Sequence, residues 1–530
     1  MLVQHFLEHS AQCLPDKTAL ICGDQRLTYS QVNDSADRLS AALIEMGIKR
    51  QDRVIIFLDN STECVISLFG ILKAGAIFII LNPTMKLKKL NYILKDSGAR
   101  AIITQGSKSK IVNEAVSEAP DLRHIIWIGK PDFSVREDAS GTVHHKWEDL
   151  FSRIQSPNLM GSPVGIDIDL ATIIYTSGST GEPKGVMSTH YNMVAAARSI
   201  TQYLENVEDD IILEALPLSF DYGLYQVIMA FMFGGTVALE KSFAFPFKVI
   251  EKLVQERVTG FPIVPTMAAM LLQMESLPKF DFSSLRYITN TAASLPVAYI
   301  RKLQTLFPHV KIYSMYGLTE CKRVSYLPPD QLDRRPNSVG IPIPNEEVFV
   351  IDENGQEVRP GEIGELVVRG LNVMQGYWND PEGTSRTFRP GKYRGEAMLY
   401  TGDLFKRDEE GFLYFVARKD DMIKTKGERV SPKEIENTLC ELKGVAEVAV
   451  IGVPDEIFGQ AIKAYIVCRD GKELSEGQVK KFCMENLEPF MVPKYVEFRK
   501  SLPKSSHGKV DKKALEKGDG FIYGNKGQRV

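Results

Sequence analysis

The feature that most constrains the fold is an alternation of helix-like and strand-like apolar segments between residues 28 and 81. Apolar side chains first recur at spacings of four and three residues, which marks one face of a helix, at Val32, Ala36, Leu39, Leu43 and Met46. Thr28 or Ser30 can cap this helix, and Gly47 can end it. The sequence then predicts a strand, a helix and a second strand, over Arg53–Leu58, Thr62–Lys73 and Ala76–Leu81. Strands that alternate with helices favour crossover connections, and therefore a largely parallel sheet.

The same alternation continues along the chain before the pattern changes. Further strands are predicted at Ile211–Leu216, Thr236–Leu239 and Arg286–Ile288. After about Gly340, turn signals separate short apolar runs at residues 352–355, 359–361 and 389–391. This texture predicts a small β-rich subdomain over about 340–415.

A charged segment, Arg418–Asp421, precedes a final compact unit with predicted strands at Val445–Val453 and Ala461–Cys468. Charged joints with few apolar residues are typical of domain boundaries, and 530 residues are too many for one ordinary core. We therefore expect an α/β protein with a large N-terminal domain, residues 1–419, of parallel sheets layered with helices plus the β-rich subdomain. A small α+β C-terminal domain, residues 420–530, would follow it.

The composition, 44% hydrophobic and 25% charged, is that of a folded soluble protein. A net charge of −3 gives no reason to expect nucleic acid or an anionic membrane as a partner. The longest apolar stretches, Leu72–Leu81 and Val227–Leu239, are shorter than the roughly twenty residues of a membrane span. The seven cysteines are scattered without a CxxC pair, and the start of the chain lacks the pattern of a signal peptide. These features predict a cytoplasmic protein with reduced thiols.

The strongest local signal is the segment YTSGSTGEPKG at residues 175–185, which follows a predicted strand, Leu170–Ile174. It combines three glycines, four serine or threonine hydroxyls and one lysine in eleven positions. Glycines let backbone N–H groups turn toward an anion and hydroxyls add donors, so this loop is a candidate phosphate cradle. Its spacing is not that of the GxxxxGK[ST] loop of nucleotide triphosphatases, and a flexible surface turn is the alternative.

Shorter motifs follow in a fixed order: Tyr316–Glu320 (YGLTE), Tyr400–Leu404 (YTGDL), Arg418–Asp420 (RKD) and Lys504–Lys509 (KSSHGK). Each is weak alone, since it could be a helix cap, a tight turn or a solvated tail. In this order and spacing, the chain resembles the adenylate-forming superfamily of acyl-CoA synthetases, luciferases and nonribosomal adenylation domains. The resemblance extends from about Phe6 to Leu515.

The resemblance implies an enzyme that uses ATP and Mg²⁺ to activate a carboxylic acid as its acyl-adenylate and then transfers the acyl group to a thiol. The glycine-rich loop would hold pyrophosphate, through Thr176, Ser177, Gly178, Ser179, Thr180, Gly181 and Lys184. The resemblance also implies that Tyr316 stacks on adenine, that Thr319 contacts the α-phosphate and that Glu320 holds Mg²⁺. Asp403 would bind the ribose hydroxyls with Arg418 nearby.

The resemblance further implies that the C-terminal domain is mobile. Lys509 would place its ammonium between the substrate carboxylate and the α-phosphate during adenylation. Asp420 matches the hinge position about which the small domain of such enzymes rotates to a second pose for thioester formation. In that pose the loop of residues 426–429 would replace Lys509, with Gly427 leaving room for a pantetheine arm. An ordinary linker charge is the alternative for Asp420.

The segment LPLSFDYG at residues 216–223 matches the place where amino-acid-activating relatives carry an aromatic residue followed by aspartate. Phe220 and Asp221 fit this pattern, and a buried carboxylate needs a partner such as a substrate ammonium. Arg323 falls at a pocket-lining position of relatives, and a cation there is unusual for an apolar amino acid. The alternative is therefore an Asp221–Arg323 ion pair with a substrate that is not an amino acid.

Tyr222 and Tyr225 also match pocket-lining positions, where bulky rings would shorten the cavity and suit a small substrate. Our leading hypothesis is a ligase that activates a small amino acid, with L-proline as the best guess, and loads a separate carrier protein bearing phosphopantetheine. The second is an AMP-forming acyl- or aryl-CoA ligase for a small acid without an amino group. The third, a non-catalytic binding protein, is disfavoured because the motif residues occur together.

Overall fold

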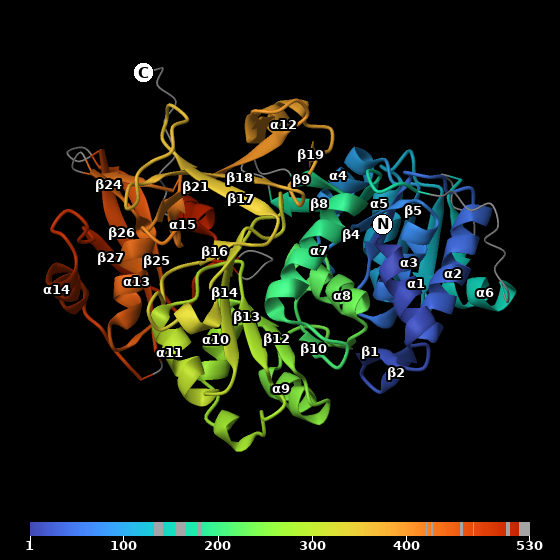
Figure 1. Cartoon of the computed structure of the whole chain (residues 1–530), viewed down its shortest axis with the longest axis horizontal. Coiled ribbons are helices and arrows are strands. Elements are labelled where there is room, and N and C mark those ends of the chain that lie inside the picture. The colour runs from blue at the N-terminus through green and yellow to red at the C-terminus, as the bar shows by residue number, and fades with distance from the viewer. Residues whose placement is uncertain are drawn as a thin grey trace.

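The structure is a computed structural model. It describes residues 1–131, 141–154, 165–177, 183–419, 421–425, 428–455, 459–469, 471–504 and 509–518. Within these ranges the strands form four sheets, of which the two large ones draw their strands from residues 18–377 (Figure 1).

The first large sheet has a parallel centre with antiparallel edges. Its order is β16 (Ile341–Pro342), β15 (Ser325–Tyr326), β14 (Lys311–Tyr316), β13 (Tyr287–Asn290), β12 (Gly260–Ile263), β10 (Ile211–Glu214), β11 (Thr236–Leu239), β1 (Thr18–Cys22) and β2 (Gln25–Thr28). The predicted strands of this region are confirmed, with ends shifted by one or two residues.

The second large sheet is parallel from β8 to β7 and antiparallel at β9 and β19. Its order is β19 (Gly376–Tyr377), β9 (Pro183–Thr189), β8 (Leu170–Ser177), β4 (Ile77–Ile80), β3 (Arg53–Phe57), β5 (Ala101–Gln105), β6 (His124–Ile128) and β7 (Val143–Lys146). β3 is buried on both faces: Val54 and Ile56 belong to one apolar cluster, and Ile55 and Phe57 to another. A parallel sheet covered on both sides requires such a strand.

A layer of helices packs between the two large sheets: α1 (Gln4–Cys13), α2 (Tyr29–Glu45), α3 (Thr62–Lys73), α7 (His190–Leu204) and α8 (Asp221–Phe233), with α6 (Trp147–Arg153) against α2. The predicted helix is confirmed as α2. It begins at a reciprocal capping box formed by Thr28 and Gln31. Gly47 follows its end at φ 84°, a conformation that glycine adopts without strain.

The remaining helices of this part cover the outer faces (Figure 1). They are α4 (Leu87–Ser97), α5 (Ser109–Val116), α9 (Pro246–Gln255), α10 (Pro265–Leu272) and α11 (Val297–Leu306), with short 3-10 turns η1 (Gly106–Lys108), η2 (Leu277–Lys279) and η3 (Pro329–Gln331).

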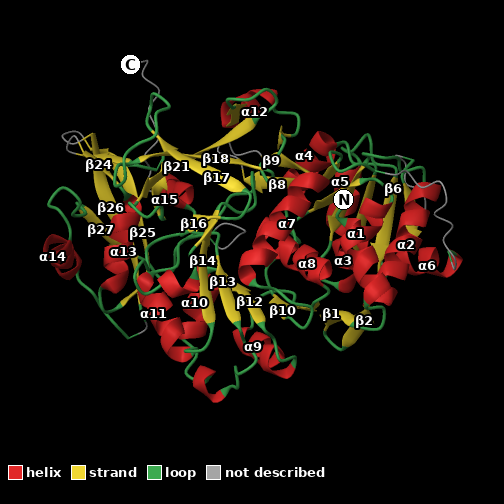
Figure 2. Cartoon of the chain, in the orientation of Figure 1, coloured by secondary structure: helices red, strands yellow, loops and turns green. Residues whose placement is uncertain are grey.

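The β-rich region is a separate antiparallel sheet with the order β17 (Glu346–Ile351), β18 (Gly364–Gly370), β21 (Ala397–Arg407) and β20 (Phe388–Pro390). A fifth strand, β22 (Leu413–Arg418), also pairs with β21. Figure 2 shows one helix, α12 (Pro381–Thr387), next to this sheet.

The last sheet has the order β24 (Glu428–Val430), β23 (Ile423–Thr425), β26 (Gly459–Cys468) and β25 (Val445–Asp455), with β27 (Tyr495–Phe498) parallel to β26. It carries α13 (Pro432–Glu441), α14 (Glu476–Asn486) and α15 (Lys512–Gly518). The predicted fold class is therefore confirmed: a large α/β part, a β-rich unit and a small α+β unit.

Candidate functional site

The described ends of the glycine-rich segment belong to the two strands of a β-hairpin. β8 and β9 are antiparallel, with Thr176 opposite Lys184 and Ser177 opposite Pro183. The predicted residues Gly178, Ser179, Thr180 and Gly181 lie outside the described residues. This hairpin explains why the spacing of a strand-to-helix phosphate loop is absent from the sequence.

Lys184 connects this hairpin to the motif around Glu320. Its ammonium lies 3.1 Å from Asp380 Oδ2 and 4.9 Å from the centre of the Tyr377 ring. Tyr377 in turn donates a hydrogen bond of 2.7 Å to Glu320 Oε1. A hydrogen bond from the Gly383 N–H and the charge of Lys184 hold the pKa of Asp380 below its usual value. Thr319, beside Glu320, is buried.

A second group of predicted residues meets where β14 faces the β-rich sheet. Tyr316 ends β14 and donates a hydrogen bond of 2.6 Å to Asp403 Oδ2. Arg418 stands opposite Asp403 on β22 and donates through Nε to Asp403 Oδ1 at 3.0 Å. Burial raises the pKa of Asp403, although Arg418 and Tyr316 oppose that shift. The phenol, carboxylate and guanidinium thus form one connected polar unit.

Lys509, from the C-terminal part of the chain, is influenced by the charges of both groups. The residue keeps solvent access, yet desolvation is the largest influence on its ammonium and lowers its pKa. The negative charges of Asp221, Asp403 and Glu320 act on it in the opposite direction, Asp221 most strongly. The described pose therefore brings Lys509 within electrostatic reach of the N-terminal site residues.

Asp221 is the first residue of α8 and is buried, with 8% of its side chain exposed. The cation that contacts it is Lys322, whose Nζ lies 3.6 Å from Asp221 Oδ2 and donates to the Asp221 backbone oxygen at 2.8 Å. The alternative of an Asp221–Arg323 ion pair is therefore wrong in its partner. In the sequence only Arg323 matches a pocket-lining position of relatives, so Lys322 was not singled out.

Lys322 is among the most perturbed groups of the site. Its side chain is 1% exposed, and its ammonium lies 4.6 Å from the ring centre of Tyr225 and 5.4 Å from that of Tyr222. Burial lowers its pKa to about 7, although Asp221 favours the charged form. A buried group with a strongly shifted pKa beside a candidate site is a functional candidate.

The other predicted pocket residues lie around the same helix. Tyr222 and Tyr225 are each 1% exposed, and Tyr222 Oη is 2.6 Å from Thr289 Oγ1. Phe220 precedes α8 and packs against the main apolar cluster. Arg323 is buried with its guanidinium 5.5 Å from the Tyr222 ring centre, so it too lies beside these tyrosines.

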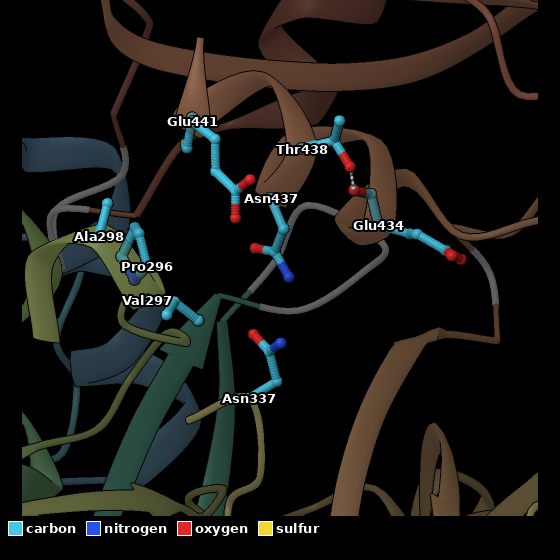
Figure 3. A pocket seen from close by; sticks show the side chains of 9 residues that line it. Pro296, Val297, Ala298, Asn337, Glu434, Asn437, Thr438 and Glu441 are labelled. Atoms are coloured by element: carbon cyan, nitrogen blue, oxygen red, sulfur yellow. Dashed lines mark hydrogen bonds between the residues drawn. The ribbon is translucent and has the colours of Figure 1, made fainter. Parts of the chain in front are cut away.

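Two predicted residues, Asp420 and Gly427, lie outside the described residues. Near the joint, Tyr299 of α11 donates a hydrogen bond of 3.3 Å to the backbone oxygen of Ala446. A cavity of about 210 Å³ lies between parts of α11 and α13, and Figure 3 shows Asn337, Asn437 and Glu441 directed toward it. The contact between the two units is thus partly hollow.

Glu320 is the predicted ligand of Mg²⁺. Among the described residues, no cluster of three or more His, Cys, Asp or Glu side chains could hold an ion. Glu320 offers one carboxylate with Tyr377 on one oxygen, and Mg²⁺ needs only one or two protein carboxylates when phosphate oxygens complete its shell. The donor set fits Mg²⁺ together with a nucleotide.

In the described part of the chain, no helix is both long and apolar enough to cross a membrane.

The comparisons with known proteins agree with this geometry. The AMP-binding enzyme family matches residues 7–378, and the AMP-binding enzyme C-terminal domain matches residues 434–509. The long-chain-fatty-acid–CoA ligase of Bacillus subtilis is 31% identical, over 97% of this chain and 94% of the relative.

Solved structures are similar over the whole length. An anthranilate CoA ligase, AuaEII, in complex with anthranoyl-AMP has a TM-score of 0.88 and 29% identity, covering 98% of this chain and 97% of its own. ATP-bound MatB from Rhodopseudomonas palustris has a TM-score of 0.87 and 28% identity, covering 99% of this chain and 100% of its own.

The fold and site thus define an ATP-using, AMP-forming ligase of the acid–thiol class. The chain belongs to the AMP-binding enzyme family, as the resemblance predicted. The hypothesis of an amino acid substrate and a carrier protein is not supported by these relatives, whose names indicate CoA ligases.

Proposed function

We propose that this protein is an AMP-forming acyl- or aryl-CoA ligase for a small carboxylic acid that lacks an α-amino group. The observation that carries this proposal is the buried contact between Asp221 and Lys322. A carboxylate placed to bind a substrate ammonium would need that charge, whereas the Asp221 carboxylate already contacts a buried lysine of its own chain. The buried tyrosines of α8 match pocket-lining positions of relatives, where bulky rings would suit a small substrate.

In the proposed reaction, an oxygen of the substrate carboxylate attacks the α-phosphorus of ATP. The new O–P bond forms as the bond to the β-phosphate oxygen breaks, and pyrophosphate leaves. The CoA thiolate then attacks the acyl carbon, and AMP leaves. Both steps depend mainly on positioning and charge neutralisation.

The residues of the site suit the first step. Lys184 and the hairpin donors would hold the departing pyrophosphate, and Tyr316 with Asp403 would hold the nucleoside. Thr319 would contact the α-phosphate, and Lys509 would bridge it to the carboxylate. Mg²⁺, held by Glu320 and phosphate oxygens, would supply further neutralisation of the phosphate charge.

We also propose that residues 420–530 form a domain that rotates about Asp420. The β-rich sheet ends with β22 at Arg418 and the next sheet begins with β23 at Ile423, so few residues join them. Rotation would withdraw Lys509 and bring Gly427 toward the site for the thiol step. The hollow contact between α11 and α13 supports a joint that can separate.

The test is pyrophosphate exchange with a panel of small acids, followed by thioester formation with free CoA. The panel pairs each amino acid with its analogue that lacks the amino group, such as proline with cyclopentanecarboxylate. We expect exchange with simple acids and thioester formation on CoA. Exchange restricted to amino acids, with no thioester on CoA, would refute the proposal and favour the amino acid hypothesis.

A further inference from the structure

We propose that Lys322 is a positioning residue for adenylate formation: it holds the Asp221 carboxylate in an interior pair and so leaves Lys509 free to meet the reacting groups. The inference rests on the proposed function only in assigning Lys509 to adenylation. It assigns a role to a residue that matches no part of the motifs recognised in the sequence.

The contacts of Lys322 restrain both the main chain and the side chain of Asp221. Its Nζ donates to the Asp221 backbone oxygen at 2.8 Å and lies 3.6 Å from Oδ2. The rings of Tyr222 and Tyr225 flank the ammonium at 5.4 Å and 4.6 Å. An ammonium over aromatic faces is stabilised there, so the lysine has little freedom to leave.

The backbone around Lys322 fixes it to the catalytic segment. Lys322 adopts φ 68°, a left-handed conformation that is unfavourable for a residue with a side chain. Its N–H bonds to the Leu318 oxygen at 2.8 Å, and the Arg323 N–H bonds to the Cys321 oxygen at 2.8 Å. A Cβ at Gly317 would lie 2.4 Å from the Lys322 oxygen, so glycine is required there. The turn therefore fixes the position of Lys322 relative to Thr319 and Glu320.

The charges around Asp221 give this restraint a catalytic consequence. Asp221 interacts with Lys322 from the interior and is the strongest attractive charge acting on Lys509. The other groups that act on Lys322 are Glu214 of β10, which attracts it, and Arg323, which repels it. Without Lys322, the Asp221 carboxylate would turn to Lys509 as its remaining cation. The charge of Lys509 would then be paired with a protein carboxylate and not with the substrate carboxylate and the α-phosphate.

The experiment measures the two half-reactions separately in Lys322→Met, using pyrophosphate exchange and thioester formation from supplied acyl-adenylate. We expect exchange at pH 6.5 to fall about 10- to 100-fold, the loss typical of one charge-assisted contact, and thioester formation to stay within about threefold. Equal losses in both half-reactions would overturn the inference.

A rescue variant separates positioning from a structural role. In Asp221→Asn/Lys322→Met the carboxylate that would capture Lys509 is gone, so exchange should recover to within about fivefold of wild type. In this double variant no buried charge is left without its partner. It therefore still tests the inference if the Lys322→Met variant does not fold. Exchange no better than about 100-fold below wild type in the double variant would refute the inference.

Lys73→Met is the matched control, because the side chain of Lys73 is only 6% exposed and its Nζ lies 2.6 Å from Asp37, on the α2–α3 contact away from the site. We expect its two half-reactions to keep the wild-type ratio; a selective loss of exchange here too would make the Lys322 result nonspecific and overturn the inference. Pyrophosphate exchange by the wild type with the acid panel tests the proposed function independently of Lys322. The ratio of the two half-reactions tests the role of Lys322 with any acid that supports exchange.

Discussion

The burial of Lys322 leads to a quantitative prediction for the pH dependence of stability. Lys322→Met removes a lysine whose pKa is about 7 in the folded protein, against an ordinary value of 10.5. Between these values the unfolded chain binds a proton that the folded chain does not. The free energy of unfolding of the wild type must therefore rise with pH in this window through Lys322, and this contribution is lost as the pH falls toward 7.

The magnitude follows from the two pKa values. One pKa unit corresponds to about 1.4 kcal/mol, so the full difference between the two pKa values corresponds to about 5 kcal/mol. Since titration near pH 7 is incomplete, the part gained between pH 7 and pH 9 is about 2 kcal/mol. We expect the free energy of unfolding of wild type minus that of Lys322→Met to rise by this amount between pH 7 and pH 9.

Equilibrium urea unfolding followed by tryptophan fluorescence can test this difference. The three tryptophans, Trp127, Trp147 and Trp378, all precede residue 380, so the signal reports the part of the chain that contains Lys322. A difference between wild type and variant that stays flat from pH 7 to pH 9 would show that Lys322 is not buried as a titrating group. The reasoning about its pair with Asp221 would then fail.

Three further predictions concern the proposed roles. Lys509→Ala should reduce pyrophosphate exchange by at least about 100-fold, a loss of about 3 kcal/mol of charge stabilisation, and spare thioester formation from supplied adenylate; equal losses would contradict domain alternation. Asp420→Pro should slow one half-reaction selectively because proline fixes φ near about −65°, and unchanged rates in both would place the hinge elsewhere. Asp403→Asn leaves Tyr316 and Arg418 without their charged acceptor, so the KM for ATP should rise about tenfold with little change in the KM for the acid; a normal KM for ATP in steady-state kinetics would exclude a nucleoside role.

The sequence by itself determined the secondary structure where the signals are local. The helix α2 was predictable because its apolar face and its Thr28 cap lie within one short segment. The alternation of strands and helices fixed a layered, largely parallel fold, since only helices on both faces can bury such strands. The order of the motifs likewise identified the family before any contact was known.

Only the tertiary structure decided which charges meet. Asp221 and Lys322 are 101 positions apart, and both Lys322 and Arg323 were available in the same short segment. The left-handed turn at Lys322 and the packing of Tyr222 and Tyr225 direct the lysine, not the arginine, toward Asp221. Burial and the resulting pKa depend on every element packed around a side chain, so residue types and spacing do not encode them locally.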